Sequence, residues 1–393
     1  MFEIIEKEPT NTIIKVIGVG GAGGNAVEHM IRENVQGVEF ICANTDAQAL
    51  SRSQVKHKLQ LGKTGLGAGA KPEVGKAAAE SERERIADAL RGSHMVFITA
   101  GMGGGTGTGA APVVAQVARE MGILTVGVVT KPFGFEGKRM KIADAGLAEL
   151  AKNVDSLIVI LNERLMEVLG DDASMQDGFK AADNVLRNAV GGIAEIINFP
   201  GLVNVDFEDV RTVMGEMGMA MMGSAVASGM DRARIAAEQA VASPLLEGVH
   251  LSGARGVLVN ITASSNLKMK EVHEVMNTIK AFADPEAEVI FGAVFDENMA
   301  DELRVTVVAT GLGAVSAKQA KQPNISIVPQ QRTGTDGLYV SSGTNYAELD
   351  VPAVMRSGRG GAARASANTQ VQAMAASGMP TLDIPAFLRK QAD

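Results

Sequence analysis

Apolar runs and helix-like segments alternate between Ile13 and Leu161. The six apolar runs read IIKVIGV, VEFICAN, KLQLG, MVFITA, LTVGVVT and SLIVIL, and segments with helical spacing separate them, near residues 24–34, 72–91, 108–121 and 140–152. Continuous apolar strands joined through helices are typical of a parallel sheet that is covered on both faces. We therefore expect an α/β fold of the Rossmann-like type, in which ligands bind at the carboxyl ends of the strands.

A long central helix and a second, smaller domain are predicted after this alternation. Over roughly 175–198, apolar residues spaced three or four apart indicate one buried helical face, namely Phe179, Ala182, Leu186, Val190, Ile193 and Ile197. Two further helical patterns follow near 208–222 and 231–242. Strand-like runs and a helix near 268–282 then complete a mixed α/β domain that ends near Gly313.

The chain divides into six predicted segments. We expect an N-terminal extension (1–12), a nucleotide-binding domain (13–174), the central helix (175–200), the second α/β domain (201–313), a linker (314–379) and a terminal peptide (380–393). The linker is rich in Gln, Ser, Ala, Gly and Thr, and its apolar residues repeat at no period. Such a composition predicts disorder, because it cannot bury a core.

Composition excludes several classes of protein. A net charge of -8 argues against a nucleic-acid binder. The single cysteine, Cys42, lies in an apolar run, excludes an intramolecular disulfide and is typical of a cytosolic chain. Acidic residues precede the first apolar run, which is wrong for a signal peptide. The stretch 217–230 is too short and too rich in Gly and Ser to cross a bilayer, so we expect a buried helix there and a soluble cytoplasmic protein without membrane insertion.

The first of three glycine-rich segments is GVGGAGGNAV, which follows a predicted strand and opens a helix. Gly18, Gly20 and Gly23 satisfy the G-x-G-x-x-G fingerprint of dinucleotide-binding proteins, and Asp46 follows the next strand. Taken alone, this segment is compatible with an NAD-dependent dehydrogenase, and also with a tight turn that needs glycine only for packing.

The second segment, LGKTGLGAG, resembles the end of a P-loop. His57 occupies the position at which a P-loop requires its first glycine, and no helical pattern starts at Thr64. We therefore interpret this segment as a flexible loop.

The third segment, AGMGGGTGTG, lies between a predicted strand and a predicted helix. Its glycines leave backbone N–H groups uncovered at a helix N-terminus, where the macrodipole favours anions, and Thr106 and Thr108 add hydroxyl groups. A dinucleotide needs one such loop for its pyrophosphate. Two glycine loops at two strand ends favour a triphosphate that is held from two sides.

Several motifs of the chain resemble those of a known family. GGGTGTG at residues 103–109 looks like the signature of tubulin-like GTPases. Together with KVIGVGGAGGNAV, NTDAQAL, VVTKPFGFEG, NVDFEDVRTVM, GARGVLVNIT, DELRVTVVATG and the terminal DIPAFLR, it makes the chain similar to the bacterial cell-division branch of the tubulin/FtsZ family, over about residues 11–313 and the last dozen. The resemblance implies a cytoplasmic GTPase that polymerises into the division ring at mid-cell.

The resemblance also implies a set of nucleotide-binding residues. GTP, and GDP after hydrolysis, would be held by two loops and their neighbours: Gly20, Gly21, Ala22, Gly23, Gly24, Asn25, Asn44, Asp46, Gly104, Gly105, Thr106, Gly107 and Thr108. Glu136 and Arg139 would contact the ribose and base region. Arg139 follows Glu136 by three residues rather than the four usual in the family, so Lys138 is an alternative.

Asp183, on the central helix, would accept hydrogen bonds from N1 and the exocyclic amine of guanine, according to the same resemblance. From its position in the helix alone, Asp183 is better interpreted as a solvated acid.

The acidic segment NVDFEDV has two interpretations that are compatible with each other. Spacing alone makes Asp206 an N-cap and puts Asp209 at the third helical position. The resemblance implies that Asn204, Asp206 and Asp209 orient and polarise the attacking water in the next subunit, since positioning and charge stabilisation supply most of the rate in phosphoryl transfer. Such a head-to-tail contact generates an open filament when the rotation does not close a ring.

Mg²⁺ is expected with the triphosphate, although no carboxylate cluster in the sequence marks a dedicated metal site. A related hypothesis is a structural relative that binds GTP and hydrolyses it poorly, and the presence of both Asp206 and Asp209 argues against it.

The terminal peptide combines a cluster of apolar residues with two basic ones. A short apolar cluster on a flexible tether suits docking into the groove of a partner, and the alternative is an inert tail. The resemblance implies membrane-tethering adaptors of FtsA and ZipA type as partners, bound through Leu382, Ile384, Pro385, Phe387 and Leu388.

Overall fold

The computed structural model describes residues 12–170, 173–199, 203, 205–215, 218–243 and 254–312. The predicted linker and terminal peptide, including Leu382, Ile384, Pro385, Phe387 and Leu388, lie outside the described residues. So do Asn204 and almost all of the predicted N-terminal extension. All of the described residues belong to one compact unit.

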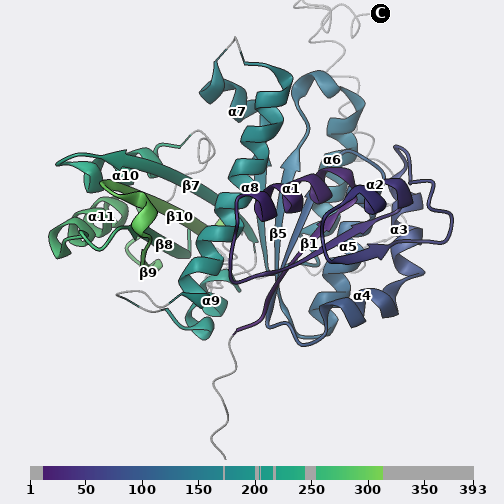
Figure 1. The fold of residues 1–393 in the computed structure, drawn as a ribbon, viewed down its shortest axis with the longest axis horizontal. Helices are drawn as coiled ribbons and strands as arrows, with labels where there is room; N and C mark the ends of the chain where they lie inside the picture. The colour runs from purple at the N-terminus through teal and green to yellow at the C-terminus, as the bar shows by residue number, and fades with distance from the viewer. Residues whose placement is uncertain are drawn as a thin grey trace, which may run out of the picture. The chain divides into compact units, whose positions relative to one another are not determined.

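The described strands form one sheet in the order β3-β2-β1-β4-β5-β6-β7-β10-β8-β9 (Figure 1). Their bounds are β1 Ile14–Val19, β2 Glu39–Asn44, β3 His57–Gln60, β4 Met95–Gly101, β5 Leu124–Lys131, β6 Ser156–Leu161, β7 Gly218–Ser228, β8 Gly256–Ala263, β9 Glu288–Phe295 and β10 Glu302–Leu312. The strands from β3 to β7 are parallel to their neighbours, β10 is antiparallel to both β7 and β8, and β8 is parallel to β9. The predicted parallel sheet is therefore confirmed, with a mixed continuation.

The helices are α1 Gly20–Arg32, α2 Ala47–Arg52, α3 Pro72–Glu80, α4 Arg83–Leu90, α5 Thr106–Glu120, α6 Lys138–Leu150, α7 Asn162–Leu169, α8 Met175–Asn198, α9 Phe207–Met214, α10 Arg232–Val241 and α11 Met269–Phe282. Short 3-10 turns occur at Gly134–Glu136 and Glu297–Met299. The predicted central helix corresponds to α8, and the pattern near 72–91 corresponds to two helices. Among the described helices, none is both long and apolar enough to cross a membrane.

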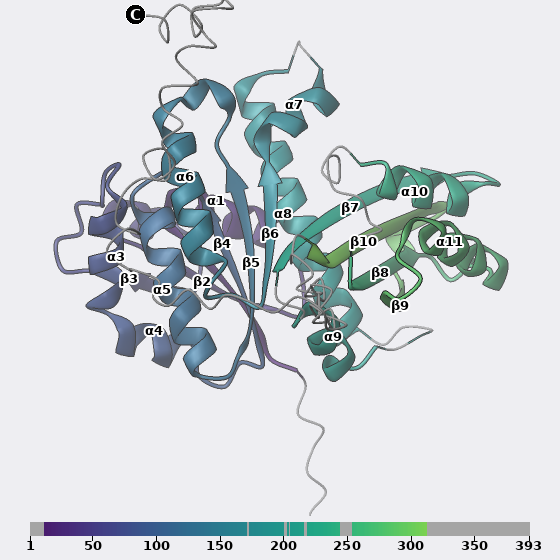
Figure 2. The ribbon, with the colours of Figure 1, turned by 180° about the vertical axis from the view of Figure 1, so that it is seen from behind.

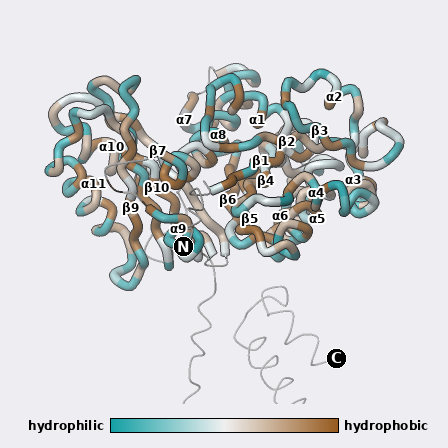
Figure 3. Tube along the Cα trace, turned by 60° about the horizontal axis from the view of Figure 1, so that its bottom comes forward, coloured by the Kyte–Doolittle hydropathy of each residue, from teal (hydrophilic) through white to brown (hydrophobic). Residues whose placement is uncertain are grey.

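Both faces of the parallel part of the sheet are buried. Val16 belongs to a core cluster that α1 and α8 cover, whereas the next residue, Ile17, belongs to a cluster that α3, α4 and α5 cover. Figure 1 views the side of α1, and Figure 2 views the side of α5 and α6. Hydrophobic stretches follow the strands in Figure 3. This two-sided burial explains why the strands are apolar without alternation.

The mixed part of the sheet, from β7 to β9, is covered by a separate pair of helices. Helices α10 and α11 pack on one face of β7, β8 and β10, in a third core cluster. The opposite face carries Leu258 and Val308, which join the cluster of α8. Asn260 of β8 also donates from Nδ2 to the backbone oxygen of Gly192 in α8, at 3.1 Å. Helix α8 therefore contacts both parts of the sheet.

One predicted helix is wrong. The pattern near 208–222 and the apolar stretch 217–230 were both expected to be helical, but α9 ends at Met214 and residues 218–228 form strand β7. β7 pairs with β6 on one side and with β10 along most of its length on the other. Alanine and methionine favour helices locally, and pairing with two distant strands outweighs that preference.

Candidate nucleotide site

The two glycine loops follow neighbouring strands. β1 and β4 are parallel and in register, with Val19 opposite Ala100, so their carboxyl ends lie side by side. Helix α1 starts directly after β1, and α5 starts after the four residues that follow β4. Neither helix has a side-chain cap among the described residues or an acidic residue in its first turn. The N–H groups of both first turns are therefore left for an anionic ligand.

Packing explains several of the glycines. A Cβ on Gly18 would collide with the backbone of Gly23, and one on Gly23 would collide with the carbonyl oxygen of Thr99. Gly20 has a φ of +77°, and its Cβ would be 2.9 Å from the backbone nitrogen of Gly107 in the other loop. The G-x-G-x-x-G fingerprint is thus accounted for by close packing between helix and strand, as the packing interpretation predicts.

Packing does not explain Gly21 and Gly104. Apart from the residues adjacent in the chain and the backbone of the same helix, no described atom lies within 4 Å of the position that a Cβ would occupy at either residue. Both glycines line a cavity of about 350 Å³, together with Ala22, Gly105, Thr106 and Gly107. The open space beside these backbones suits a ligand that approaches the N–H groups of the two helices, such as a chain of phosphates.

The same cavity is lined by the residues that follow β5 and β6. Glu136 and Arg139 form an ion pair of 2.6 Å, and Glu136 also accepts a hydrogen bond from the backbone nitrogen of Phe133 at 3.0 Å. Asn162, the first residue after β6, is buried, and its Oδ1 has no hydrogen-bond partner among the described residues. No sequence motif singled out Asn162, although its position at the carboxyl end of an apolar strand was a usable signal.

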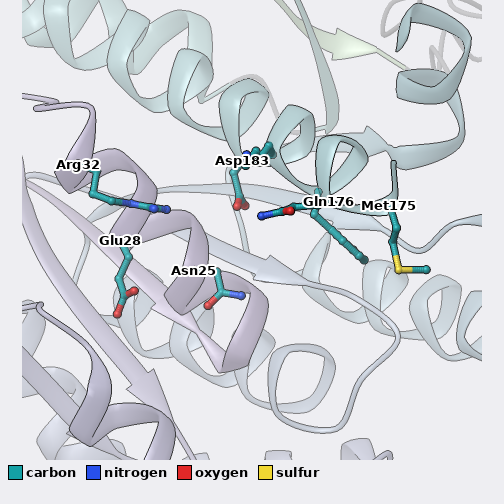
Figure 4. Close-up of a pocket in the computed structure, with 8 residues that line it drawn as sticks. Asn25, Glu28, Arg32, Met175, Gln176 and Asp183 are labelled. Carbon is teal, nitrogen blue, oxygen red and sulfur yellow. The ribbon is translucent and has the colours of Figure 1, made fainter. Parts of the chain in front are cut away.

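A second cavity, of about 550 Å³, lies between α1 and α8 (Figure 4). It is lined by Asn25, Glu28, Arg32, Met175, Gln176, Phe179, Lys180 and Asp183. Phe179 also lines the first cavity, so the two cavities adjoin. Its ring packs edge-on against Phe133, with centroids 5.6 Å apart.

Asp183 is partly buried rather than solvated. Burial raises the pKa of its carboxyl to about 6, and the positive charges of His29 and Arg32 act in the opposite direction. In Figure 4 the side chains of Asp183 and Arg32 extend into the same space. A carboxyl held in a cavity next to cations can accept hydrogen bonds from a ligand, which makes Asp183 a candidate base-recognition residue.

Four predicted residues have other contacts in the structure. The Thr108 hydroxyl is buried and accepts a hydrogen bond from the backbone nitrogen of Gly103 at 2.8 Å, so Thr108 shapes the loop. The Asp46 carboxylate caps α2, and the Asn44 side chain accepts from the backbone nitrogen of Asp46. The Thr106 hydroxyl lies 2.6 Å from that of Thr45, which links the second glycine loop to the segment after β2.

The segment that resembles the end of a P-loop starts no helix. Gly62, Gly65, Gly67 and Gly69 all have positive φ angles. The loop is hydrogen-bonded to the segment after β2, since the backbone nitrogen of Ala47 donates to Gly65. The prediction of a loop is confirmed.

The predicted catalytic acids lie far from the first cavity in one chain. Asp206 caps α9 by accepting a hydrogen bond from the backbone nitrogen of Asp209 at 2.8 Å, and both side chains are exposed. The first residue of α9, Phe207, contacts His94, which directly precedes β4, whereas Gly101 at the other end of β4 lines the cavity. Since a strand rises about 3.3 Å per residue, the seven residues of β4 separate the acids from the cavity by roughly 20 Å.

The described residues hold no group of three or more His, Cys, Asp and Glu side chains arranged for a metal ion.

Known proteins match this chain along its whole length. Residues 13–170 match the model of the Tubulin/FtsZ family GTPase domain, and residues 218–313 match that of the FtsZ family C-terminal domain. The chain is 55% identical to the cell division protein FtsZ of Pseudomonas putida, with all of both chains covered, and 55% identical to that of Coxiella burnetii, with 99% of each covered. Among solved structures, an empty FtsZ dimer from M. jannaschii shares 44% identity at a TM-score of 0.74, covering 77% of this chain and 89% of that one.

Proposed function

The chain belongs to the tubulin/FtsZ family of GTPases, and from this premise we propose that it is the polymerising GTPase of a bacterial division ring. It binds guanine nucleotide and associates with copies of itself. Its place of action is the mid-cell division site. The domain arrangement that we propose is a GTP-binding domain at 13–174, the central helix at 175–200 and a C-terminal domain at 201–313.

The nucleotide spans the two cavities in this proposal. Its phosphates lie on the N-termini of α1 and α5, beside Gly21 and Gly104, whose missing side chains leave room for them. Its base lies in the cavity of Asp183, whose carboxylate accepts hydrogen bonds from N1 and the exocyclic amine of guanine. Adenine presents an unprotonated N1 to the same carboxylate and is rejected.

The ribose lies between these two ends. Phe179 lines both cavities, and Glu136 and Arg139 line the phosphate side next to it. We assign the family arginine role to Arg139 rather than Lys138, because Arg139 lines the cavity and is oriented by its ion pair with Glu136. Mg²⁺ would come with the triphosphate, and its charge would offset part of the phosphate charge.

Hydrolysis takes place between two subunits. Asn204, Asp206 and Asp209 of one subunit face the γ-phosphate of the next, where the acids orient a water molecule. The water oxygen bonds to the γ-phosphorus, the bond from that phosphorus to the bridging oxygen breaks, and GDP, inorganic phosphate and a proton leave. The separation of roughly 20 Å between the acids and the cavity in one chain is the observation that supports this arrangement most strongly.

A contact between two different faces of the same chain repeats from subunit to subunit and generates an open filament. The terminal peptide recruits membrane-tethering adaptors of FtsA and ZipA type to that filament through Leu382, Ile384, Pro385, Phe387 and Leu388.

Phosphate release from GTP and ATP, measured over a wide range of protein concentration with light scattering recorded alongside, tests the proposal. We expect turnover with GTP only, near zero in dilute protein and rising together with scattering above a threshold. Asp209→Ala should bind GTP and not turn it over. A turnover per subunit that does not change with concentration would mean that one chain holds the complete catalytic site.

A further inference from the structure

Phe207, the first residue of α9, contacts His94, which directly precedes β4 in the parallel part of the sheet. The rings of His94 and Phe207 have centroids 6.1 Å apart and planes inclined at 65°, which is an edge-on contact. Phe207 stands between Asp206 and Asp209 in sequence and is partly buried, whereas both acids are exposed. Phe207 therefore holds the first turn of α9 against the body of the protein, together with the fully buried Val210.

His94 is held rigidly at the amino-terminal edge of the sheet. Its backbone nitrogen donates to the carbonyl oxygen of Ile13 at 2.9 Å, and its carbonyl oxygen accepts from Leu124 at 3.1 Å. The ring is fixed as well, because its Nδ1 accepts a hydrogen bond from the backbone nitrogen of Ile13 at 3.0 Å. Three strands therefore determine where this imidazole lies.

The opposite end of α9 is anchored elsewhere. The Thr310 hydroxyl of β10 donates to the carbonyl oxygen of Val213 at 2.7 Å, and Val213 and Met214 are buried. The C-terminal turn of α9 is thus attached to the mixed part of the sheet, and its first turn to the parallel part. The direction in which Asp206 and Asp209 project depends on both attachments.

We propose that His94 is a positioning residue for GTP hydrolysis, which sets the orientation of the acids that one subunit presents to its neighbour. This inference rests on the proposed function, in which those acids act in trans. Water must be oriented within a fraction of an ångström of its productive position, and a misplacement of about 1 Å costs on the order of 100-fold in rate. The ring of His94 acts on catalysis through Phe207 and touches no nucleotide in its own subunit.

The test is a double-mutant cycle on the full chain with His94→Ala, Phe207→Leu and both together. We expect each single variant to bind GTP and to begin scattering light at the wild-type threshold, while its turnover per assembled subunit falls about tenfold. The double variant should lose no more than the larger single loss, because both changes remove one contact. His94→Phe, which keeps a ring at this position, should recover most of the turnover.

The control is His57→Ala, which removes an exposed histidine of β3 and should match the wild type. If losses in the double variant multiply, His94 and Phe207 act independently and the inference is wrong. It is equally wrong if His94→Ala turns over GTP at the wild-type rate, or if both single variants fail to assemble, since the contact is then needed for assembly. Asp209→Ala in the same assay separates a failure of the His94 inference from a failure of the proposed function. If Asp209→Ala retains turnover, the proposed function itself fails.

Discussion

Gly20 and Gly107 bring the two glycine loops into contact, since a Cβ on Gly20 would be 2.9 Å from the backbone nitrogen of Gly107. The first loop follows β1 and the second follows β4, so this contact joins the N-termini of α1 and α5 into one surface. A nucleotide bound to one helix terminus therefore necessarily meets the other. The glycines of these loops serve two purposes, and substitutions can separate them.

Gly21→Ala and Gly104→Ala should weaken GTP binding without destabilising the fold. A methyl group at either position meets no protein atom within 4 Å, so packing is undisturbed, but it enters the space that we assign to phosphate oxygens. We expect at least a tenfold loss of GTP affinity, with a melting temperature at or above that of the wild type. Gly21 is a helical glycine and Gly104 is a loop glycine without a positive φ, and alanine at such compatible positions stabilises by about 0.5–1 kcal/mol. Nucleotide titration and thermal unfolding measure the two effects.

Gly191→Ala is the matched control for this pair. Gly191 is a helical glycine of α8 whose Cβ would also be unobstructed, with its nearest neighbour at 3.9 Å, and it lines neither cavity. It should stabilise the protein and leave GTP affinity unchanged. Wild-type affinity in both Gly21→Ala and Gly104→Ala would remove the argument that phosphates occupy the first cavity.

GTP binding should weaken as the pH falls through about 6. Burial raises the pKa of the Asp183 carboxyl to about 6, so below that pH the group is mostly protonated and no longer accepts two hydrogen bonds from guanine. The apparent dissociation constant should be about tenfold higher at pH 5 than at pH 7, since each pH unit below the pKa costs a factor of ten.

Asp183→Asn isolates this effect, because the phosphates of the nucleotide also titrate near pH 6 and do so equally in both proteins. The ratio of variant to wild-type dissociation constants should be about tenfold smaller at pH 5 than at pH 7, because only the wild-type side chain titrates. A ratio that stays constant over this range would exclude Asp183 as the titrating group.

The strands of the parallel sheet were predictable because both of their faces are buried, and this burial requires apolar residues at successive positions. The glycine loops were predictable because backbone geometry and anion binding both demand glycine at a strand end. Strand β7 was not predictable from its residues. Its methionines and alanines favour a helix locally, and only pairing with β6 and β10, which come from distant parts of the chain, makes it a strand.

The site could be predicted in its residue types but not in its environment. The position of Asp183 in the sequence was compatible with a solvated acid, because its burial depends on residues of α1 that pack opposite it. Asn162 was missed, since a single asparagine after a strand is a weak signal until its unpaired oxygen is seen in the cavity. The distance between Asp206 and the first cavity depends on how the strands of the sheet are arranged, so a local sequence pattern cannot predict it.

Glu271→Gln should destabilise the C-terminal part of the sheet. The buried guanidinium of Arg232 forms bonds of 2.7 and 3.1 Å with Glu271 and also bonds to Asn266 and to the carbonyl oxygen of Asp301. Removing the carboxylate leaves a buried cation without its partner, which costs about 3 kcal/mol of unfolding free energy. Urea unfolding at pH 7 measures this loss.

The pH dependence of this loss has a definite sign. The Arg232 guanidinium holds the pKa of the Glu271 carboxyl below its ordinary value. The stability that the pair contributes is therefore complete above the ordinary pKa of glutamate and disappears as pH falls through the lowered pKa. Glu238→Gln is the control, because its pair with Arg234 on the same helix is exposed and contributes little to stability. Equal losses in the two variants would contradict the special role of the buried pair.

Asp206 has two candidate roles, and two substitutions distinguish them. Its carboxylate caps α9 through the backbone nitrogen of Asp209, and asparagine caps helices about as well as aspartate. Asp206→Asn should therefore keep the stability of the wild type, whereas Asp206→Ala should lose about 1 kcal/mol. If the negative charge polarises water in the neighbouring subunit, both variants should lose on the order of 100-fold in turnover per assembled subunit. Wild-type turnover in Asp206→Asn, together with slow turnover in Asp206→Ala, would mean that the cap is the whole contribution of this residue.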